Sequence, residues 1–152
     1  MFKLTRTRLV ILNVILPLII GGLIYISFRS VNLRMFVWFD AIGIHELIYK
    51  IRELFNPFKS YIPKWIYFSL PDGLWVYSFS YVLLLIWKDK LKVAIVWLII
   101  PFTAGCLVEL AQLIKVFPGT FDYLDLIMSS LGIISSLLIL KYKNEKKPYK
   151  NT

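Results

Sequence analysis

The sequence contains little cysteine, little histidine and few acidic residues. Cys106 and His45 are the single examples of their kinds among 152 residues. A disulfide therefore cannot form within this sequence, and neither HExxH nor a Cys–His zinc pattern is present. The GxSxG, P-loop and dinucleotide-binding motifs are missing as well. No common motif assigns a metal, a cofactor or a reaction, so any chemistry depends on the polar side chains that are there.

Acidic residues number 9 against 18 basic ones, which gives a net charge of +9. Such a charge invites a nucleic-acid function, but its distribution excludes one. The basic residues gather at three places, which are residues 3–8, 88–92 and 141–150. Lysine and arginine accumulate in this way on the cytoplasmic flanks of membrane-spanning helices.

The composition is typical of a membrane protein. Apolar residues make up 59% of the chain and the mean hydropathy is +0.70, whereas soluble domains are roughly 45–50% apolar. We expect an all-α integral membrane protein with one membrane domain over residues 1–152. Its four transmembrane helices are predicted at about 9–28, 70–87, 91–114 and 122–140. The first apolar run is too long for a signal peptide and lacks a cleavage pattern, so we expect it to be retained.

Four spans put all three basic clusters on one side of the membrane. We therefore expect both termini in the cytoplasm, with the loop 29–70 and a tight turn over 115–121 outside. Within the outer loop, apolar residues recur at helical spacing from Ile44 to Phe55, opposite a face that carries His45 and other charged residues. This pattern predicts a short amphipathic helix over about 43–55 that lies on the membrane surface.

Three acidic residues lie at matching positions in the predicted spans. Asp72 precedes Lys88 by 16 positions (88 − 72), Glu109 follows Lys92 by 17 (109 − 92), and Asp125 precedes Lys141 by 16 (141 − 125). At a rise of ~1.5 Å per residue, each acid lies ~24 Å from the basic flank. The hydrocarbon core is ~30 Å thick, so all three belong to the outer leaflet, where ionisable groups are costly and often functional.

Other polar residues could join this acidic site. Gln112 follows Glu109 by one helical turn, and Asp122 and Ser129 flank Asp125 at helical spacing. His45, on the surface helix, could cover the site from outside. Asp72 and Asp122 also suit helix capping, and Ser129 and Cys106 suit helix packing. Glu109 is expected to have no capping role, so its replacement by leucine should leave the fold intact.

Three stretches together resemble the VanZ-like membrane proteins, over roughly residues 68–140. They are Glu109-Leu-Ala-Gln112, Pro118-Gly-Thr-Phe-Asp122-Tyr-Leu-Asp125, and Ser129-Ser-Leu-Gly132. The family pattern is an E-x-x-Q helix end, a short outer turn and D-x-x-x-N-x-x-G opening the last helix. Asp72 resembles the aspartate of the family's D-K-x-x-H. Gly73, Val76 and Ser129 replace the Lys, His and Asn of these patterns.

The resemblance implies a bacterial inner-membrane protein with a role at the cell envelope, since the family's namesake is linked to teicoplanin resistance. Our first hypothesis is an outward-facing site that binds or modifies a lipid-linked or surface component. Asp72, Glu109 and Asp125 would form its reactive core, with Gln112, Asp122, Ser129 and His45 contacting the ligand. The second hypothesis is a non-enzymatic accessory subunit whose acids pair with a partner helix. No metal ligand set is predicted, and no cofactor is assigned.

Overall fold

The computed structural model describes residues 6–116 and 120–145, and these form helices without a strand. The turn predicted at 115–121 falls partly outside the described residues. The elements are α1 (Arg6–Val10), the π-helical segment η1 (Ile11–Ile15), α2 (Leu16–Phe28), α3 (Arg34–Ala41), α4 (His45–Phe55), the 3-10 turn η2 (Asn56–Phe58), α5 (Lys64–Phe68), α6 (Leu70–Ile86), α7 (Leu91–Leu113) and α8 (Tyr123–Glu145).

Three helices are long and apolar enough to cross a membrane. They are Arg6–Phe28, which joins α1, η1 and α2, then Lys92–Leu113 and Tyr123–Lys141. The fourth expected span corresponds to α6, an apolar helix of 17 residues. Its length is about 25 Å at 1.5 Å per residue, which is close to the thickness of the hydrocarbon core. The last helix continues past its expected end at residue 140 to Glu145.

The first long helix contains a π-helical turn, η1, shortly before Pro17. Pro17 has no backbone N–H, which loosens the helical hydrogen bonding around it. The Asn13 side-chain amide donates to the Leu9 carbonyl at 2.8 Å. Its oxygen accepts from the Tyr77 hydroxyl, also at 2.8 Å. Asn13 is only 7% exposed, so this bond satisfies a buried amide and ties η1 to α6.

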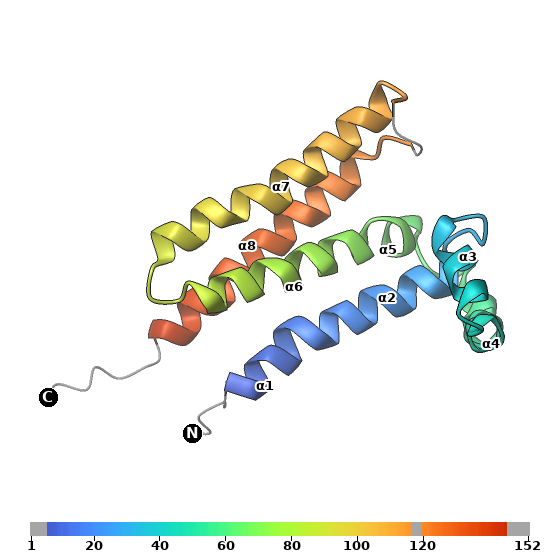
Figure 1. Cartoon of the computed structure of the whole chain (residues 1–152), viewed down its shortest axis with the longest axis horizontal. Helices are drawn as coiled ribbons and strands as arrows, with labels where there is room; N and C mark the ends of the chain where they lie inside the picture. The colour runs from blue at the N-terminus through green and yellow to red at the C-terminus, as the bar shows by residue number, and fades with distance from the viewer. Residues whose placement is uncertain (1–5, 117–119, 146–152) are drawn as a thin grey trace, which may run out of the picture.

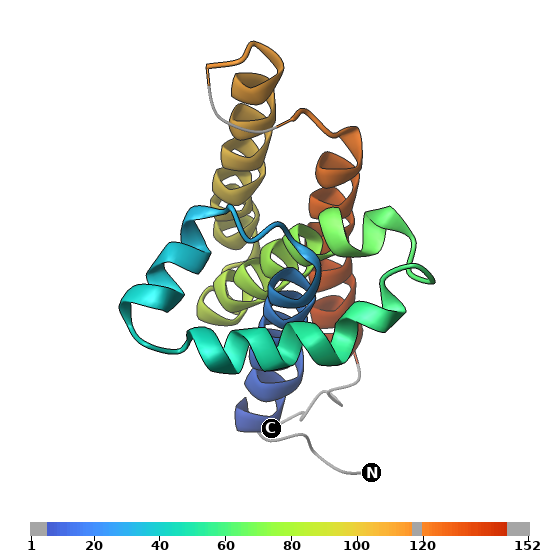
Figure 2. The same cartoon turned by 90° about the vertical axis from the view of Figure 1, so that its right-hand side faces the viewer.

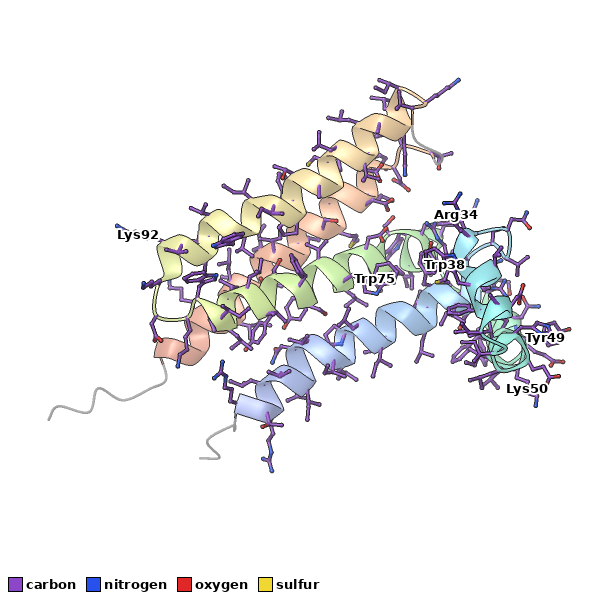
Figure 3. All side chains as sticks on the ribbon, viewed as in Figure 1. Arg34, Trp38, Tyr49, Lys50, Trp75 and Lys92 are labelled. Carbon is purple, nitrogen blue, oxygen red and sulfur yellow. The ribbon has the colours of Figure 1, made fainter. Side chains whose placement is uncertain are left out.

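The loop after α2 is largely helical. The predicted amphipathic helix is present as α4, which begins at His45, two residues after Gly43. Gly43 has φ +75, a conformation that glycine adopts without a steric cost, and it separates α3 from α4. Figure 1 shows α4 end-on while α2 runs across the view, and Figure 2 shows α4 lying across the end of the bundle. The side chains of Tyr49 and Lys50 point away from the bundle (Figure 3).

The closest helix packing joins α6 to α8 through small residues. A Cβ on Gly132 would lie 2.5 Å from the Gly73 carbonyl oxygen, and a Cβ on Gly73 would lie 2.8 Å from the Met128 carbonyl oxygen. Ser80 and Ser136 are both fully buried. Small side chains let helix backbones approach closely, which is how helices associate where water does not drive them together.

The apolar core lies at one end of the bundle. Leu84, Ala94, Leu98 and Leu140 form one buried cluster that holds α6, α7 and α8 together. From this end, α7 and α2 diverge toward the end where α6 begins (Figures 1 and 2). The beginning of α1 and the end of α8 lie at the same end as the turn between α6 and α7 (Figure 1).

Candidate functional site

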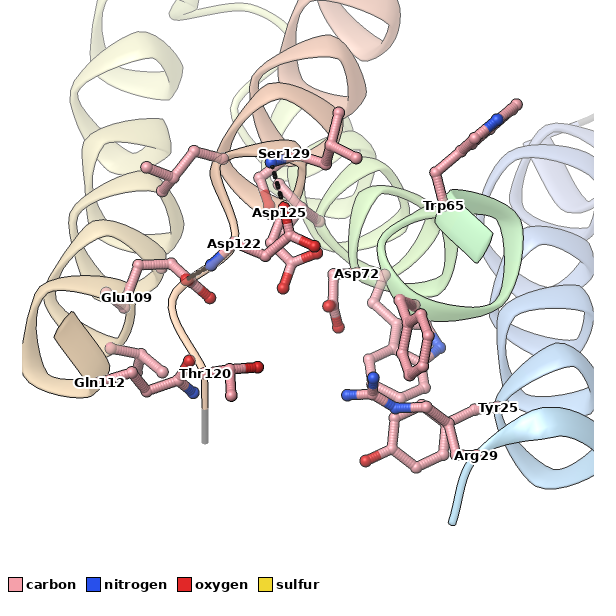
Figure 4. A pocket seen from close by; sticks show the side chains of 18 of the residues that line it. Tyr25, Arg29, Trp65, Asp72, Glu109, Gln112, Thr120, Asp122, Asp125 and Ser129 are labelled. Atoms are coloured by element: carbon pink, nitrogen blue, oxygen red, sulfur yellow. Dashed lines mark hydrogen bonds between the residues drawn. The ribbon is translucent and has the colours of Figure 1, made fainter. Parts of the chain in front are cut away.

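A cavity of about 950 Å³ opens at the end opposite the apolar core, among α2, α5, α6, α7 and α8. Six of the seven residues that the sequence suggested for a site line this cavity. They are Asp72, Glu109, Gln112, Asp122, Asp125 and Ser129, and Figure 4 shows their side chains around a common space. The prediction that three distant acids converge from three helices therefore agrees with their placement, while their roles stay a prediction.

Each acid reaches the cavity for a local reason. Pro71 occupies the first turn of α6, where its missing N–H costs nothing, and Asp72 follows it in that turn. Asp125 lies in the first turn of α8, where a negative charge is favourable. Glu109 lies one turn before the end of α7. That helix ends at Leu113. Lys115, two residues later, has φ +58, and the N–H groups of Val116 and Lys115 donate to the carbonyls of Ala111 and Gln112, respectively, in a Schellman motif.

Glu109 has a structural role as a hydrogen-bond acceptor. Its side chain is 7% exposed, and its Oε2 accepts a hydrogen bond from the Asp122 backbone N–H at 2.9 Å. Asp122 in turn caps α8, since its Oδ1 accepts from the Leu124 N–H at 2.9 Å. The expectation that Glu109 has no capping role is therefore wrong. It satisfies a backbone donor just before α8 and connects that helix to α7.

The other two acids lack a well-formed hydrogen bond of this kind. Asp125 is close enough to Ser69 and Glu109 to interact with both side chains, yet its Oδ1 is buried without a hydrogen bond of good geometry. The Ser69 hydroxyl is also buried and unpartnered. The Asp72 carboxyl group makes no hydrogen bond within residues 6–116 and 120–145. Two carboxyl groups thus face the cavity with unused hydrogen-bonding capacity.

Sequence reasoning missed the cations of this cavity, Arg29 and Lys64. The Arg29 guanidinium carbon lies 5.1 Å from the ring centres of both Tyr25 and Phe68, and such cation–π contacts orient it. Its Nε is buried without a hydrogen-bond partner. Figure 4 shows Arg29 and Tyr25 across the cavity from Glu109, Asp122 and Asp125, with Asp72 between the two groups. The i, i+4 spacing of Tyr25 and Arg29 was a usable signal for this contact.

His45 lies elsewhere and does not line the acidic cavity. It borders a second cavity of about 550 Å³ between the end of α2 and the α3–α4 pair. Arg52, on the same helix, donates to the Ile26 carbonyl and lies 5.1 Å from the centre of the Phe36 ring. These contacts fix α4 under the end of α2, and burial lowers the pKa of the Arg52 guanidinium. The expectation that His45 covers the acidic site is therefore wrong.

Among the residues that the structure describes, no group of three or more His, Cys, Asp or Glu side chains is arranged to hold a metal ion. Comparisons with protein-family models, with curated proteins and with solved structures gave no match. The fold and the site define a helical protein with three helices compatible with a membrane and a cavity of mixed charge at one end of the bundle.

Proposed function

We propose that this chain is a VanZ-like bacterial inner-membrane protein with four spans, and that its cavity binds a lipid-linked or surface component of the cell envelope. In this arrangement α6 is the fourth span and α4 lies on the outer membrane surface. The basic residues beside α1, in the α6–α7 turn and at the end of α8 share one end of the bundle. The positive-inside rule supports a cytoplasmic location for that end and an outward-facing cavity.

One observation carries the proposal: a single cavity collects four acids and also contains apolar and aromatic walls. Pro101, Ala104 and Val108 of α7 form part of one wall, and Trp65 and Trp75 contribute to the other. Ligand sites combine apolar walls with a few placed polar groups in this way. A lipid-linked molecule needs both, because its chain is apolar and its headgroup is polar.

The same carboxyl groups are the candidates for chemistry if the bound component is modified. Asp72, Glu109 and Asp125 reach one space from three helices, and carboxyl groups serve as general acids and bases when they contact a reacting group. Glu109 is partly committed to the Asp122 N–H. Asp72 and Asp125 are therefore the acids with the most capacity for a ligand.

Photo-crosslinking in bacterial cells tests this function. A photoreactive amino acid in place of Gly105 would project from α7 where no other atom lies within 4 Å of its Cβ, beside the cavity. The same amino acid in place of Leu107, which is 65% exposed on α7, is the matched control. We expect a lipid-linked adduct specific to position 105 that Asp72→Asn reduces.

Equal adducts at both positions, indifferent to Asp72→Asn, would contradict the proposed site. A protein adduct at position 105 that persists through purification would favour the accessory-subunit hypothesis instead. Mass spectrometry of the crosslinked species distinguishes these outcomes, because a lipid-linked adduct and a protein adduct differ greatly in mass.

A further inference from the structure

The cavity has two oppositely charged sides that do not contact each other. Asp125 lies on one side and Arg29 on the other, with Asp72 between them (Figure 4). Lys88 and Asp89 form an ion pair at the far end of the bundle, and among residues 6–116 and 120–145 no ion pair joins Arg29 or Lys64 to an acid. Arg29 interacts with Asp72 and Asp125 only at longer range. The charges are close enough to influence one another and too far apart to pair.

Such an arrangement is unfavourable on its own. A charge in a partly desolvated place is costly unless it is paired and hydrogen-bonded. Here the Arg29 Nε and the Asp125 Oδ1 are both buried without a partner. Direct pairing across the cavity would relieve both groups, but the rings of Tyr25 and Phe68 hold the guanidinium in place. A ligand with both charges would satisfy the two sides together.

We infer that the cavity selects a zwitterionic group of the phosphoethanolamine type, with its phosphate at Arg29 and Lys64 and its primary ammonium at Asp72 and Asp125. This inference rests on the proposed function and narrows it to a headgroup class. Arginine suits a phosphate because its planar fork can donate two parallel hydrogen bonds. Lys64 is exposed at the cavity's edge and adds a second positive charge.

A primary ammonium fits the acidic side better than a quaternary one. An ammonium can donate hydrogen bonds to the open acceptors of Asp72 and Asp125, and a choline group cannot. Choline groups are usually held by aromatic faces. Arg29 already occupies the faces of Tyr25 and Phe68, so the free aromatic surface near the cation is reduced.

Defined lipids in nanodiscs test the headgroup class without any variant. Native mass spectrometry would measure the retention of phosphatidylethanolamine, phosphatidylcholine and phosphatidylglycerol at equal concentration. We expect phosphatidylethanolamine to be retained roughly tenfold better than either of the others, since each lacks one set of charge-assisted hydrogen bonds. Soluble glycerophosphoethanolamine is the competitor that distinguishes a free zwitterion from a lipid headgroup. Its displacement of the lipid at millimolar concentration would show that the headgroup alone is recognised.

Two substitutions test which side of the cavity binds the phosphate and which binds the ammonium. Arg29→Gln should weaken retention of phosphatidylethanolamine and phosphatidylglycerol alike, while Asp72→Asn should weaken only the former. Asp89→Asn, in the distant α6–α7 turn with an 86% exposed side chain, is the control and should change neither. Circular dichroism shows whether each variant keeps its helices.

Equal retention of all three lipids by the unmodified protein would overturn the inference, even if either variant failed to fold. The proposed function would survive that result if the crosslink at position 105 remained specific. Loss of the specific crosslink at position 105 would contradict both the proposed function and the headgroup inference.

Discussion

At the scale of residues, the buried polar groups divide into those with protein partners and those without. Glu109 bonds the Asp122 N–H, and Asn13 bonds both the Leu9 carbonyl and the Tyr77 hydroxyl. Asp125 leaves one buried oxygen unpartnered. An unpartnered buried polar group lowers stability, so its presence beside a cavity favours a ligand.

We predict that Glu109→Gln keeps stability within about 0.5 kcal/mol, because the amide oxygen can still accept from the Asp122 N–H. Glu109→Leu removes that acceptor and should cost about 1–3 kcal/mol. Thermal unfolding in detergent measures the difference between the two variants. A leucine variant as stable as the glutamine variant would mean that the hydrogen bond to Asp122 contributes nothing.

The Asn13–Tyr77 bond should show up as a coupling energy. Tyr77→Phe leaves the Asn13 side-chain oxygen without its donor, and Asn13→Leu removes the amide entirely. We expect the double variant to recover about 0.6–2 kcal/mol relative to the sum of the single changes, the range for hydrogen bonds between apolar helices in membranes. A coupling near zero in a double-mutant cycle of unfolding free energies would show that the bond does not join η1 to α6.

At the scale of elements, the α6–α8 contact depends on glycine. Gly132→Ala places a methyl group 2.5 Å from the Gly73 carbonyl oxygen, so the helices must separate. We expect a cost of about 1–3 kcal/mol, typical of overpacking. Gly22→Ala is the matched control, because a Cβ there has nothing within 4 Å and alanine is the better helix former.

The unfolding temperatures of Gly132→Ala and Gly22→Ala test whether the α6–α8 contact depends on glycine. The Gly132 variant should unfold at a lower temperature than the unmodified protein, and the Gly22 variant at an equal or higher one. Equal unfolding temperatures for the two variants, or an unchanged unfolding temperature for Gly132→Ala, would show that α6 and α8 can separate without loss of stability.

The sequence predicted the long helices well because hydropathy alone determines them. It also located Asp72 and Asp122 at helix starts, where backbone chemistry favours them. It missed α3 and α5, which are short, and it missed Arg29 as part of the cavity. It also associated His45 with the acids, although the packing of Ile48 and Arg52 under α2 carries that face of α4 to another cavity. These features depend on contacts between distant segments, which residue spacing does not record.

At the scale of the whole molecule, the two ends of the bundle differ in kind. One end holds the apolar core and the basic flanks, and the other holds the cavity with its acids. The positive-inside rule predicts that the basic end lies on the cytoplasmic side of a membrane, and the cavity would then open to the outside.

We predict that the two ends lie on opposite sides of the membrane. Tyr61 is 84% exposed beyond α4, and the side chain of Asp89 is 86% exposed in the α6–α7 turn. In a background with Cys106→Ala, Tyr61→Cys should react with an impermeant thiol reagent in intact cells. Asp89→Cys should react only after permeabilisation. Reaction of both from outside would contradict four spans with cytoplasmic termini.

The most direct test of the central claim is whether water-soluble reagents reach the acidic cavity from outside. Ser129 and Ser136 lie two turns apart on α8 and are 8% and 0% exposed, yet only Ser129 lines the cavity. In the background with Cys106→Ala, we predict that Ser129→Cys reacts with a charged methanethiosulfonate added to intact cells and that Ser136→Cys does not. Equal protection at both positions would contradict an outward-open site among Asp72, Glu109 and Asp125.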